Sequence, residues 1–408
     1  MEWSRFDNTM QRRILHHASR GNTLSKLATV CREWAALIEE TNFAKLDITS
    51  NDLGGFLDFV HDRPHRHHLL QYLRFVVEIP VREKVDELES MTFTDEVTIR
   101  VMLGRLGLLL DILSAWDIDK IMKLKPEYDG LTLEVSVRPY GCPWQLAQGG
   151  RTASTTLSRS ASVHGPPSEY ERPSAGGFWS GTSQVDLITK LYLLERTDAH
   201  VPPSAVFELC EKLPLLTEIC YEPGPTGSNL VDTEFLRFSL SALTLSRKSD
   251  TFRNLHILYQ NDRANGAQRN RGSEASQDMV EILCRASLTL EEVVICNVIE
   301  AGAFFKKMAL LEVPRLWDRW KPWSRLRHVT LATDAFHPND RAATRSLLLL
   351  AAFTARSMPA LQAMELFRVG HTCGAMFQYT NWSERSEGAC ILWQSSWRFQ
   401  FEEDERKE

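Results

Sequence analysis

Apolar side chains recur at helical spacing near the start of the chain. The stretch from Leu24 to Phe43 places them at Leu24, Leu27, Ala28, Cys31, Trp34, Ala35 and Ile38. This i, i+3, i+4, i+7 pattern predicts a helix that buries one face. A shorter stripe precedes it at Phe6, Met10, Ile14 and Leu15, and Gly21-Asn22-Thr23 predicts the turn between the two. The pattern therefore predicts a small helical unit over residues 1–50.

The next hundred residues mix helical and strand patterns. Leu53, Phe56, Leu57 and Val60 form one helical face, and Thr94-Asp95-Glu96 predicts the start of a helix that continues through Val101–Leu113. Leu73–Ile79 is an apolar strand candidate. Leu131, Leu133, Val135 and Val137 alternate with polar residues, as in a strand with one buried face. Residues 51–144 are therefore predicted to be a mixed linker region that holds the first repeat-like units.

Residues 145–184 differ in composition from their surroundings. Ser, Thr, Gly and Pro dominate, and aliphatic residues nearly vanish. Such a segment buries too little apolar area to offset its backbone entropy, so we predict a disordered insertion.

From residue 185 onward a helical stretch repeatedly leads into a short leucine-containing strand. The predicted strands are Leu213–Ile219, Phe252–Leu258, Leu288–Val294, Trp323–Val329 and Met358–Met364. Within them, Leu255, Leu290, Leu326 and Leu361 lie 35, 36 and 35 residues apart. A recurring strand and helix, neither able to close a core alone, predicts an irregular leucine-rich-repeat-like solenoid over residues 185–408. Ordinary α/β segments with chance spacing are the alternative.

The C-terminal residues leave this repeat. Met376–Tyr379, Cys390–Trp393 and Trp397–Phe401 are aromatic-rich strand candidates separated by polar turns. They predict a β-hairpin that caps the end of the stack. The final Glu402–Glu408 is predicted to be a solvated charged end.

Composition excludes several classes of function. The net charge is −6 and no long basic run occurs, so the footprint of a nucleic-acid binder is missing. No apolar run is long enough to span a membrane, and the N-terminus lacks the apolar core of a secretory signal. Eight cysteines are scattered singly, which is typical of reduced thiols in the cytoplasm or nucleus.

Catalytic motifs are absent from the sequence. No phosphate-binding glycine loop or nucleophile elbow occurs, and Cys31 falls on an apolar helical stripe where a buried, inert thiol is expected. The cluster His61, His65, His67 and His68 has a proline at position 64, interleaved arginines and no nearby cysteine, which favours a solvated polar loop over a metal site. We therefore expect no enzyme, no metal and no cofactor. A metal-dependent hydrolase that uses His61–His68 is the alternative from another class.

The order of these segments resembles fungal F-box proteins with a divergent leucine-rich-repeat-like C-terminal domain. The F-box part is the run Val30-Cys31-Arg32-Glu33-Trp34 with Leu37 and Ile38 after it. Further similar segments are Asn42–Leu46, Asp117–Lys120, Lys125–Leu131 and Ile219–Pro223. Each motif is short, so the resemblance depends on their order along the chain. The family opens its F-box with Leu-Pro, where this chain has Phe6-Asp7; Asp7 or Asn8 can replace the proline by capping the helix.

The resemblance implies the substrate-recognition subunit of an SCF-type ubiquitin ligase. Its F-box docks on a Skp-type adaptor, which joins a cullin scaffold, and its repeat domain binds a target protein. The expected adaptor-binding residues are Phe6, Met10, Ile14, Leu24, Leu27, Val30 and Trp34. Two alternatives remain: a scaffold that has lost adaptor binding, and N-terminal helices that pack only on the repeat domain.

The densest supply of interface-forming residues in the predicted repeat domain is Leu316–Arg327. Aromatic and arginine side chains commonly anchor protein interfaces, so the candidates for target binding are Trp317, Arg319, Trp320, Trp323 and Arg325. Tryptophans three residues apart also suit the packing of a helix onto a core, which is the alternative reading. The target itself leaves no portable motif in the sequence.

Overall fold

One sheet of eleven strands organises the molecule. The computed structural model describes residues 7–19, 28–79, 96–139, 179, 181–194, 201, 203–222, 230–259, 274–311, 323–369, 373–381 and 388–397. The strands are β1 (Lys45–Thr49), β2 (Tyr72–Ile79), β3 (Leu131–Pro139), β4 (Ile188–Leu193), β5 (Glu218–Tyr221), β6 (Asn254–Leu258), β7 (Glu292–Cys296), β8 (His328–Ala332), β9 (Ala363–Val369), β10 (Gly374–Asn381) and β11 (Ala389–Ser395). They lie side by side in the order in which they occur along the chain.

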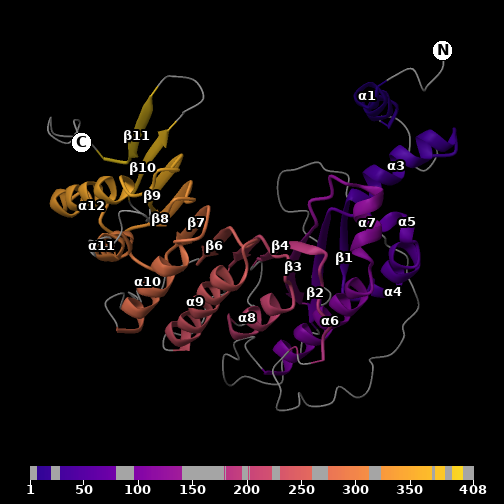
Figure 1. Ribbon diagram of the computed structural model, residues 1–408, viewed down its shortest axis with the longest axis horizontal. Helices are drawn as coiled ribbons and strands as arrows, with labels where there is room; N and C mark the ends of the chain where they lie inside the picture. The colour runs from indigo at the N-terminus through magenta and orange to yellow at the C-terminus, as the bar shows by residue number, and fades with distance from the viewer. Residues whose placement is uncertain are drawn as a thin grey trace.

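The helices connect these strands and lie outside them. They are α1 (Asn8–Ser19), α3 (Arg32–Ala44), α4 (Leu53–Phe56), the π-helical turn η2 (Leu57–His61), α5 (Pro64–His67), α6 (Glu96–Ser114), α7 (Ile118–Leu124), α8 (Pro203–Glu211), α9 (Leu230–Lys248), α10 (Glu274–Ala286), α11 (Ala301–Leu311) and α12 (Arg341–Ala355). The sheet curves into an arc, with α8 to α12 along its outer side (Figure 1). The predicted mixed α/β class is confirmed.

Neighbouring strands from β1 to β9 are parallel, and β10 and β11 add an antiparallel hairpin at the end. Parallel neighbours need a crossover connection, which the intervening helices provide from β4 onward. The ordered succession of parallel strands therefore begins at β1, well before residue 185.

Two rows of apolar side chains cross all nine parallel strands on the face toward the helices, which we call the core face. One row is Leu46, Leu73, Leu133, Leu191, Ile219, Leu255, Val293, Val329 and Met364; the other is Ile48, Phe75, Val135, Leu193, Tyr221, Ile257, Ile295, Leu331 and Leu366. All are nearly inaccessible to solvent. The burial of these rows explains the alternation seen in the sequence.

A tight turn precedes several strands and accounts for the recurrent leucines. The amides of Leu216, Leu290, Leu326 and Leu361 each donate to the carbonyl three residues earlier, at 3.1, 3.3, 3.2 and 3.0 Å. Leu255 lies instead within β6, where it pairs with Val293. The four leucines spaced by 35, 36 and 35 residues therefore do not occupy equivalent positions. Leu290, Leu326 and Leu361 lie in the turn, whereas Leu255 lies in a strand, so the predicted repeat is wrong at Leu255.

The N-terminal helices differ in extent from the predicted pattern. Residues 28–30 form a turn, and the helix begins at Arg32 with Cys31 as its N-cap. The amide of Trp34 donates to the Cys31 sulfur at 3.5 Å, so Cys31 is not a buried residue within the helical stripe as predicted. In α1, the carboxylate of Asp7 accepts from the amide of Met10 at 2.7 Å, which selects Asp7 as the N-cap.

The predicted disordered insertion ends earlier than residue 184. Trp179 is buried, and its indole nitrogen donates to the carbonyl of Ala205 at 2.9 Å. Val185 follows with its amide bonded to the carbonyl of Lys212 at 2.8 Å. Trp179 therefore belongs to the core, whereas residues 181–184 are described but mostly exposed. Residues 145–178 and 180 lie outside the described residues, and their disorder stays a prediction.

The predicted C-terminal hairpin is present as β10 and β11, paired from Ala375–Ser395 to Asn381–Ala389. Trp397 lies in a bend, and residues 398–401 of the third predicted strand lie outside the described residues. Within the described ranges no helix is both long enough and apolar enough to cross a membrane.

Candidate functional site

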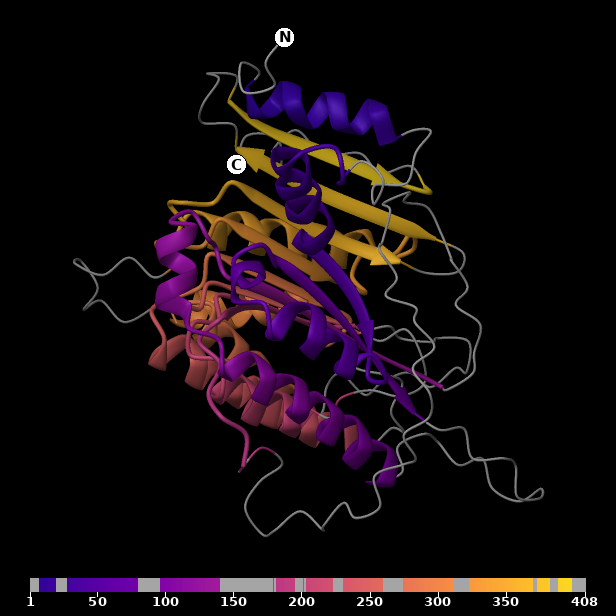
Figure 2. The same ribbon diagram turned by 90° about the vertical axis from the view of Figure 1, so that its right-hand side faces the viewer.

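The face of the sheet that points away from the core carries two rows of mostly polar side chains, which we call the open face. The rows are Lys45, Tyr72, Thr132, Lys190, Glu218, Asn254, Glu292 and His328, and Asp47, Arg74, Glu134, Tyr192, Cys220, His256, Val294, Thr330 and Glu365. Strand residues alternate between faces, so each residue of the second row sits between one member of each core row. From β4 to β9 the connecting helices lie on the opposite side (Figures 1 and 2).

One cluster of charges on the open face joins β2 and β3. Tyr72 and Arg74 lie two residues apart on β2, so both point to the same side. The Tyr72 hydroxyl donates to Glu134 on β3, and the Arg74 Nε lies 3.2 Å from the other oxygen of that carboxylate. The side chain of Glu134 is only 5% exposed. Burial, followed by the hydrogen bond to Glu134, raises the pKa of Tyr72, so this hydroxyl remains a donor at all physiological pH values.

A second cluster repeats the arrangement on β4 and β5. The Tyr192 hydroxyl donates to Glu218 at 2.7 Å, and Lys190 lies 3.2 Å from the second carboxylate oxygen. The amide nitrogen of Asn254 on β6 lies 3.3 Å from that same oxygen. Burial raises the pKa of Glu218, but the bonds from Tyr192, Lys190 and Asn254 together outweigh it, so the net pKa lies below the ordinary value.

The third polar contact, between His256 on β6 and Glu292 on β7, is more open. His256 Nε2 lies 3.3 Å from the carboxylate of Glu292, whose side chain is 32% exposed. The neighbouring His256 side chain lowers the pKa of Glu292, against a smaller opposing effect of burial. Glu292 is therefore ionised at neutral pH. Its side chain is accessible from solvent, whereas that of Glu134 is only 5% exposed.

The thiols on this face are poor nucleophiles. Burial raises the pKa of Cys220 to about 12 and that of Cys296 to about 11. Both thiols stay protonated at neutral pH, whereas the thiolate is the reactive form. The open face thus presents fixed charges and hydrogen-bonding groups over several strands, an arrangement suited to recognising an extended partner by complementary charge.

The predicted target-binding residues are divided by the structure. Trp317, Arg319 and Trp320 lie outside the described residues. Trp323 is buried, with its indole nitrogen donating to the Ser287 hydroxyl at 2.9 Å and its backbone in the left-handed region at φ 54°. Trp323 therefore belongs to the core, which agrees with the alternative that these tryptophans serve packing. Its prediction as a binding residue is wrong. Arg325 is exposed in the turn before β8.

The predicted adaptor-binding residues that the structure describes lie on α1, on α3 and in the turn before α3. Met10 is 44% exposed and Val30 is 60% exposed, while Ile14 and Trp34 are partly buried. Phe6, Leu24 and Leu27 lie outside the described residues. In Figure 1, α1 stands at one end of the arc, away from the strands.

The histidines predicted to form a solvated loop are partly packed instead. The His67 ring stacks on Trp116 with centroids 3.9 Å apart, and its Nε2 bonds the His61 carbonyl at 2.9 Å. Trp116 donates to His61 Nδ1 at 3.0 Å. Burial lowers the pKa of His67. In the part of the chain that the structure describes, no three His, Cys, Asp or Glu side chains are grouped to hold a metal.

Sequence reasoning missed the open face. Its only local signal is the spacing of Tyr72 with Arg74 and of Lys190 with Tyr192, which places each pair on one side of a strand. The partner carboxylates, Glu134 and Glu218, are 60 and 26 residues further on than Arg74 and Tyr192. Only the strand register brings them together.

Comparison with known proteins adds one match. Residues 240–406 match the model of a family of unknown function (DUF6546). No curated protein and no solved structure matches the chain. The matched part runs from within α9 through β11 and includes Glu292 of the open face.

Proposed function

We propose that this protein is a substrate-recognition subunit of an SCF-type ubiquitin ligase. Its N-terminal helices bind a Skp-type adaptor, which joins a cullin scaffold, and its open face binds the target protein. The observation that carries the proposal is the arc of sequential parallel strands, a leucine-rich-repeat-like arrangement whose charged open face is left uncovered by α8 to α12. The chain itself supplies recognition and no catalytic group.

Support for adaptor binding comes from the exposed apolar residues at the N-terminus. Met10 is exposed on α1, which stands apart from the sheet (Figure 1), and Val30 is exposed in the turn before α3. Exposed apolar side chains of this kind suit a partner groove. The family motif has a proline at the start of this helix. Here the Asp7 carboxylate caps the helix instead, by accepting from the amide of Met10.

The experiment is capture of a purified Skp-type adaptor by the full chain. Met10→Asp combined with Val30→Asp should abolish capture, because burying carboxylates in an apolar interface costs several kcal/mol. Leu310→Asp is the matched control, since Leu310 on α11 is also 60% exposed but lies far from α1 (Figure 1). Undiminished capture by the double variant contradicts the adaptor assignment. Absence of capture by the wild type supports the scaffold alternative.

Target recognition is tested separately by charge reversal on the open face. Targets captured with the cullin step blocked are identified by mass spectrometry, and their binding is compared between Glu292→Lys and Glu281→Lys. The two carboxylates are similarly exposed, at 32% and 35%, but Glu281 lies on α10 on the outer side. We expect Glu292→Lys alone to lose the targets; equal losses in both variants would place recognition elsewhere.

A further inference from the structure

The two edge strands of the sheet differ in charge. β1 and β11 stand at the ends of the strand order, and among the described strands each pairs with one neighbour. β1 has the sequence KLDIT, with Lys45 and Asp47 on the open face. β11 has the sequence ACILWQS, which contains no charged residue and no proline. Natural edge strands commonly carry charges or proline that prevent pairing with another chain, and β11 lacks this protection.

The outer edge of β11 presents hydrogen-bonding groups of its backbone. The amide of Ser396 donates to the carbonyl of Gly374 at 3.0 Å, so these residues form a hydrogen-bonded pair that continues the β10–β11 ladder. Such pairs recur at every second residue of an antiparallel ladder, down to Cys390 on β11. The residues in between, which include Ala389 and Ile391, therefore direct their amides and carbonyls away from β10.

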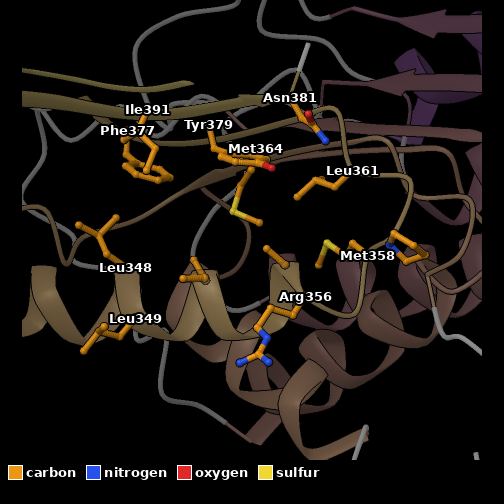
Figure 3. Close-up of a pocket in the computed structure, with 14 residues that line it drawn as sticks. Leu348, Leu349, Arg356, Met358, Leu361, Met364, Phe377, Tyr379, Asn381 and Ile391 are labelled. Carbon is orange, nitrogen blue, oxygen red and sulfur yellow. The ribbon is translucent and has the colours of Figure 1, made fainter. Parts of the chain in front are cut away.

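The side chains in the first half of β11 are exposed and mostly apolar. Ile391 is 57% exposed and Leu392 is 41% exposed, and Ala389 and Cys390 are exposed as well. Ile391 also lines an apolar pocket of about 300 Å³ between α12 and the hairpin (Figure 3). Exposed apolar side chains on an edge strand favour its pairing with another strand over its solvation.

We propose that β11 pairs with β11 of a second copy of this chain, antiparallel and about a two-fold axis at Cys390. Such a pairing is isologous, so the same strand serves both copies. Exposure selects the axis. Trp393 is only partly exposed and packs on Phe336 with ring centroids 4.9 Å apart, whereas a ladder centred on Cys390 uses the exposed half of the strand. Its hydrogen-bonded pairs join Ala389 to Ile391 of the second copy, and the reverse.

The charge of the edge is compatible with a second copy. A two-fold pairing sets identical side chains against each other at its centre, and like charges in opposite positions are destabilising. Residues 388–392 carry no charge, so this pairing meets no repulsion. The same operation on β1, about its middle residue, would set Asp47 against Asp47. Self-pairing is therefore favoured at β11 and opposed at β1.

The shape of the edge is also complementary to itself. Around the Cys390 axis, each Ile391 lies opposite Ala389 of the other copy, and each Leu392 lies opposite Gly388. Bulky side chains thus face small residues on both sides of the sheet. Because the axis is perpendicular to the sheet, the open faces of the two copies lie on the same side, and the two arcs continue as one sheet.

Sedimentation of the reduced full chain over a range of concentrations tests the pairing. The ladder is short, so we expect a weak dimer that dissociates in the range of about 1–100 µM. Cys390→Asp sets two carboxylates in opposite positions and should weaken association at least about tenfold. Cys390→Ser keeps the side chain small and neutral, and Leu310→Asp changes a residue that is 60% exposed on α11; both should leave association nearly unchanged.

Cross-linking of the wild type checks the register without any variant, so the test stands even if Cys390→Asp alters the fold. At a non-hydrogen-bonded pair the two Cys390 Cα atoms lie about 4.5 Å apart, a separation that a disulfide spans. Oxidised glutathione should join the two thiols and be reduced to two molecules of glutathione. Mass spectrometry of the digested dimer identifies the linked peptides, and the rate of linking should fall with the dimer fraction on dilution.

Three outcomes overturn the proposal. The chain can stay monomeric over the whole concentration range, Cys390→Asp and Leu310→Asp can weaken association equally, or Cys390 can remain unlinked in a wild-type dimer.

Discussion

The β2–β3 and β4–β5 regions of the open face contain similar clusters with different exposure. Each holds a glutamate between a tyrosine hydroxyl and a basic side chain from the preceding strand. In the first cluster the cation is Arg74, 15% exposed; in the second it is Lys190, 42% exposed. The same local arrangement thus forms a closed ion pair in one region and a solvated one in the other, so only the second can exchange its charge contacts with a partner.

The largest difference in stability between the two clusters is expected when each carboxylate is removed. Glu134→Ala should lower the free energy of unfolding by about 3–5 kcal/mol, because Arg74 loses its close carboxylate partner in a site shielded from water. Glu218→Ala should cost about 1–2 kcal/mol, since solvent reaches Lys190. Urea denaturation at neutral pH measures both. Equal losses would mean that the clusters are equivalent.

Removing the cations should give the next largest contrast. Arg74→Met should cost about 2–3 kcal/mol, because Glu134 loses its close cation in a site shielded from water. Lys190→Met should cost less than about 1 kcal/mol, as expected of an exposed pair. The salt dependence of the two variants provides the control: screening should weaken the Lys190 pair in the wild type and leave the Arg74 pair nearly unchanged.

The two tyrosines should contribute about equally to the free energy of unfolding, in contrast to the cations. Tyr72→Phe and Tyr192→Phe each remove one hydrogen bond to a carboxylate and should each cost about 1.5 kcal/mol in unfolding free energy. Thermal denaturation with matched heating rates measures both. A clearly larger loss for Tyr72→Phe would show that the first cluster acts as a unit and that its bonds are not additive.

The smallest of the four expected effects is the loss of stability of the second cluster at acidic pH. The pKa of Glu218 is lower in the folded protein than its ordinary value of 4.5. Its contribution is therefore present above that value and is lost as the pH falls through the folded pKa. We expect the difference in denaturation midpoint between the wild type and Glu218→Gln to shrink from pH 6 to pH 3. A difference that grows on acidification would contradict the direction of this shift.

Some elements of the fold followed from local patterns, whereas β1, β4 and the pairing of the strands were not predicted. The strands β2 and β3 and helix α6 were predicted from periodicity, since the alternation at Leu131–Val137 and the apolar run at Val101–Leu113 are local properties. The pairing of Leu255 with Val293 could not be predicted, because leucine in a turn and leucine in a strand look alike in sequence. The burial of Trp179 could not be predicted either, because a single tryptophan in a segment rich in serine and glycine gives no periodic pattern.

The candidate site depended still more on tertiary information. The prediction of Trp323 as an exposed binding residue is wrong because its ring is buried in the apolar core, where the Ser287 hydroxyl accepts from its indole nitrogen. Glu134 and Glu218 showed no signal of their own, since a lone glutamate in a strand pattern reads as a solvated residue. The long side chains of the neighbouring strand cover both carboxylates. Only the strand register determines which side chains are neighbours.

The strand order also determines how the molecule responds to tension. Because each strand is hydrogen-bonded to the strands next to it in sequence, a pull between the first and last strands acts across the sheet and loads one ladder at a time. Such a sheet opens like a zipper, in small steps at low force, with the weakest ladder first. A target held on the open face would bridge several ladders, and the tension it sustains would be shared among them.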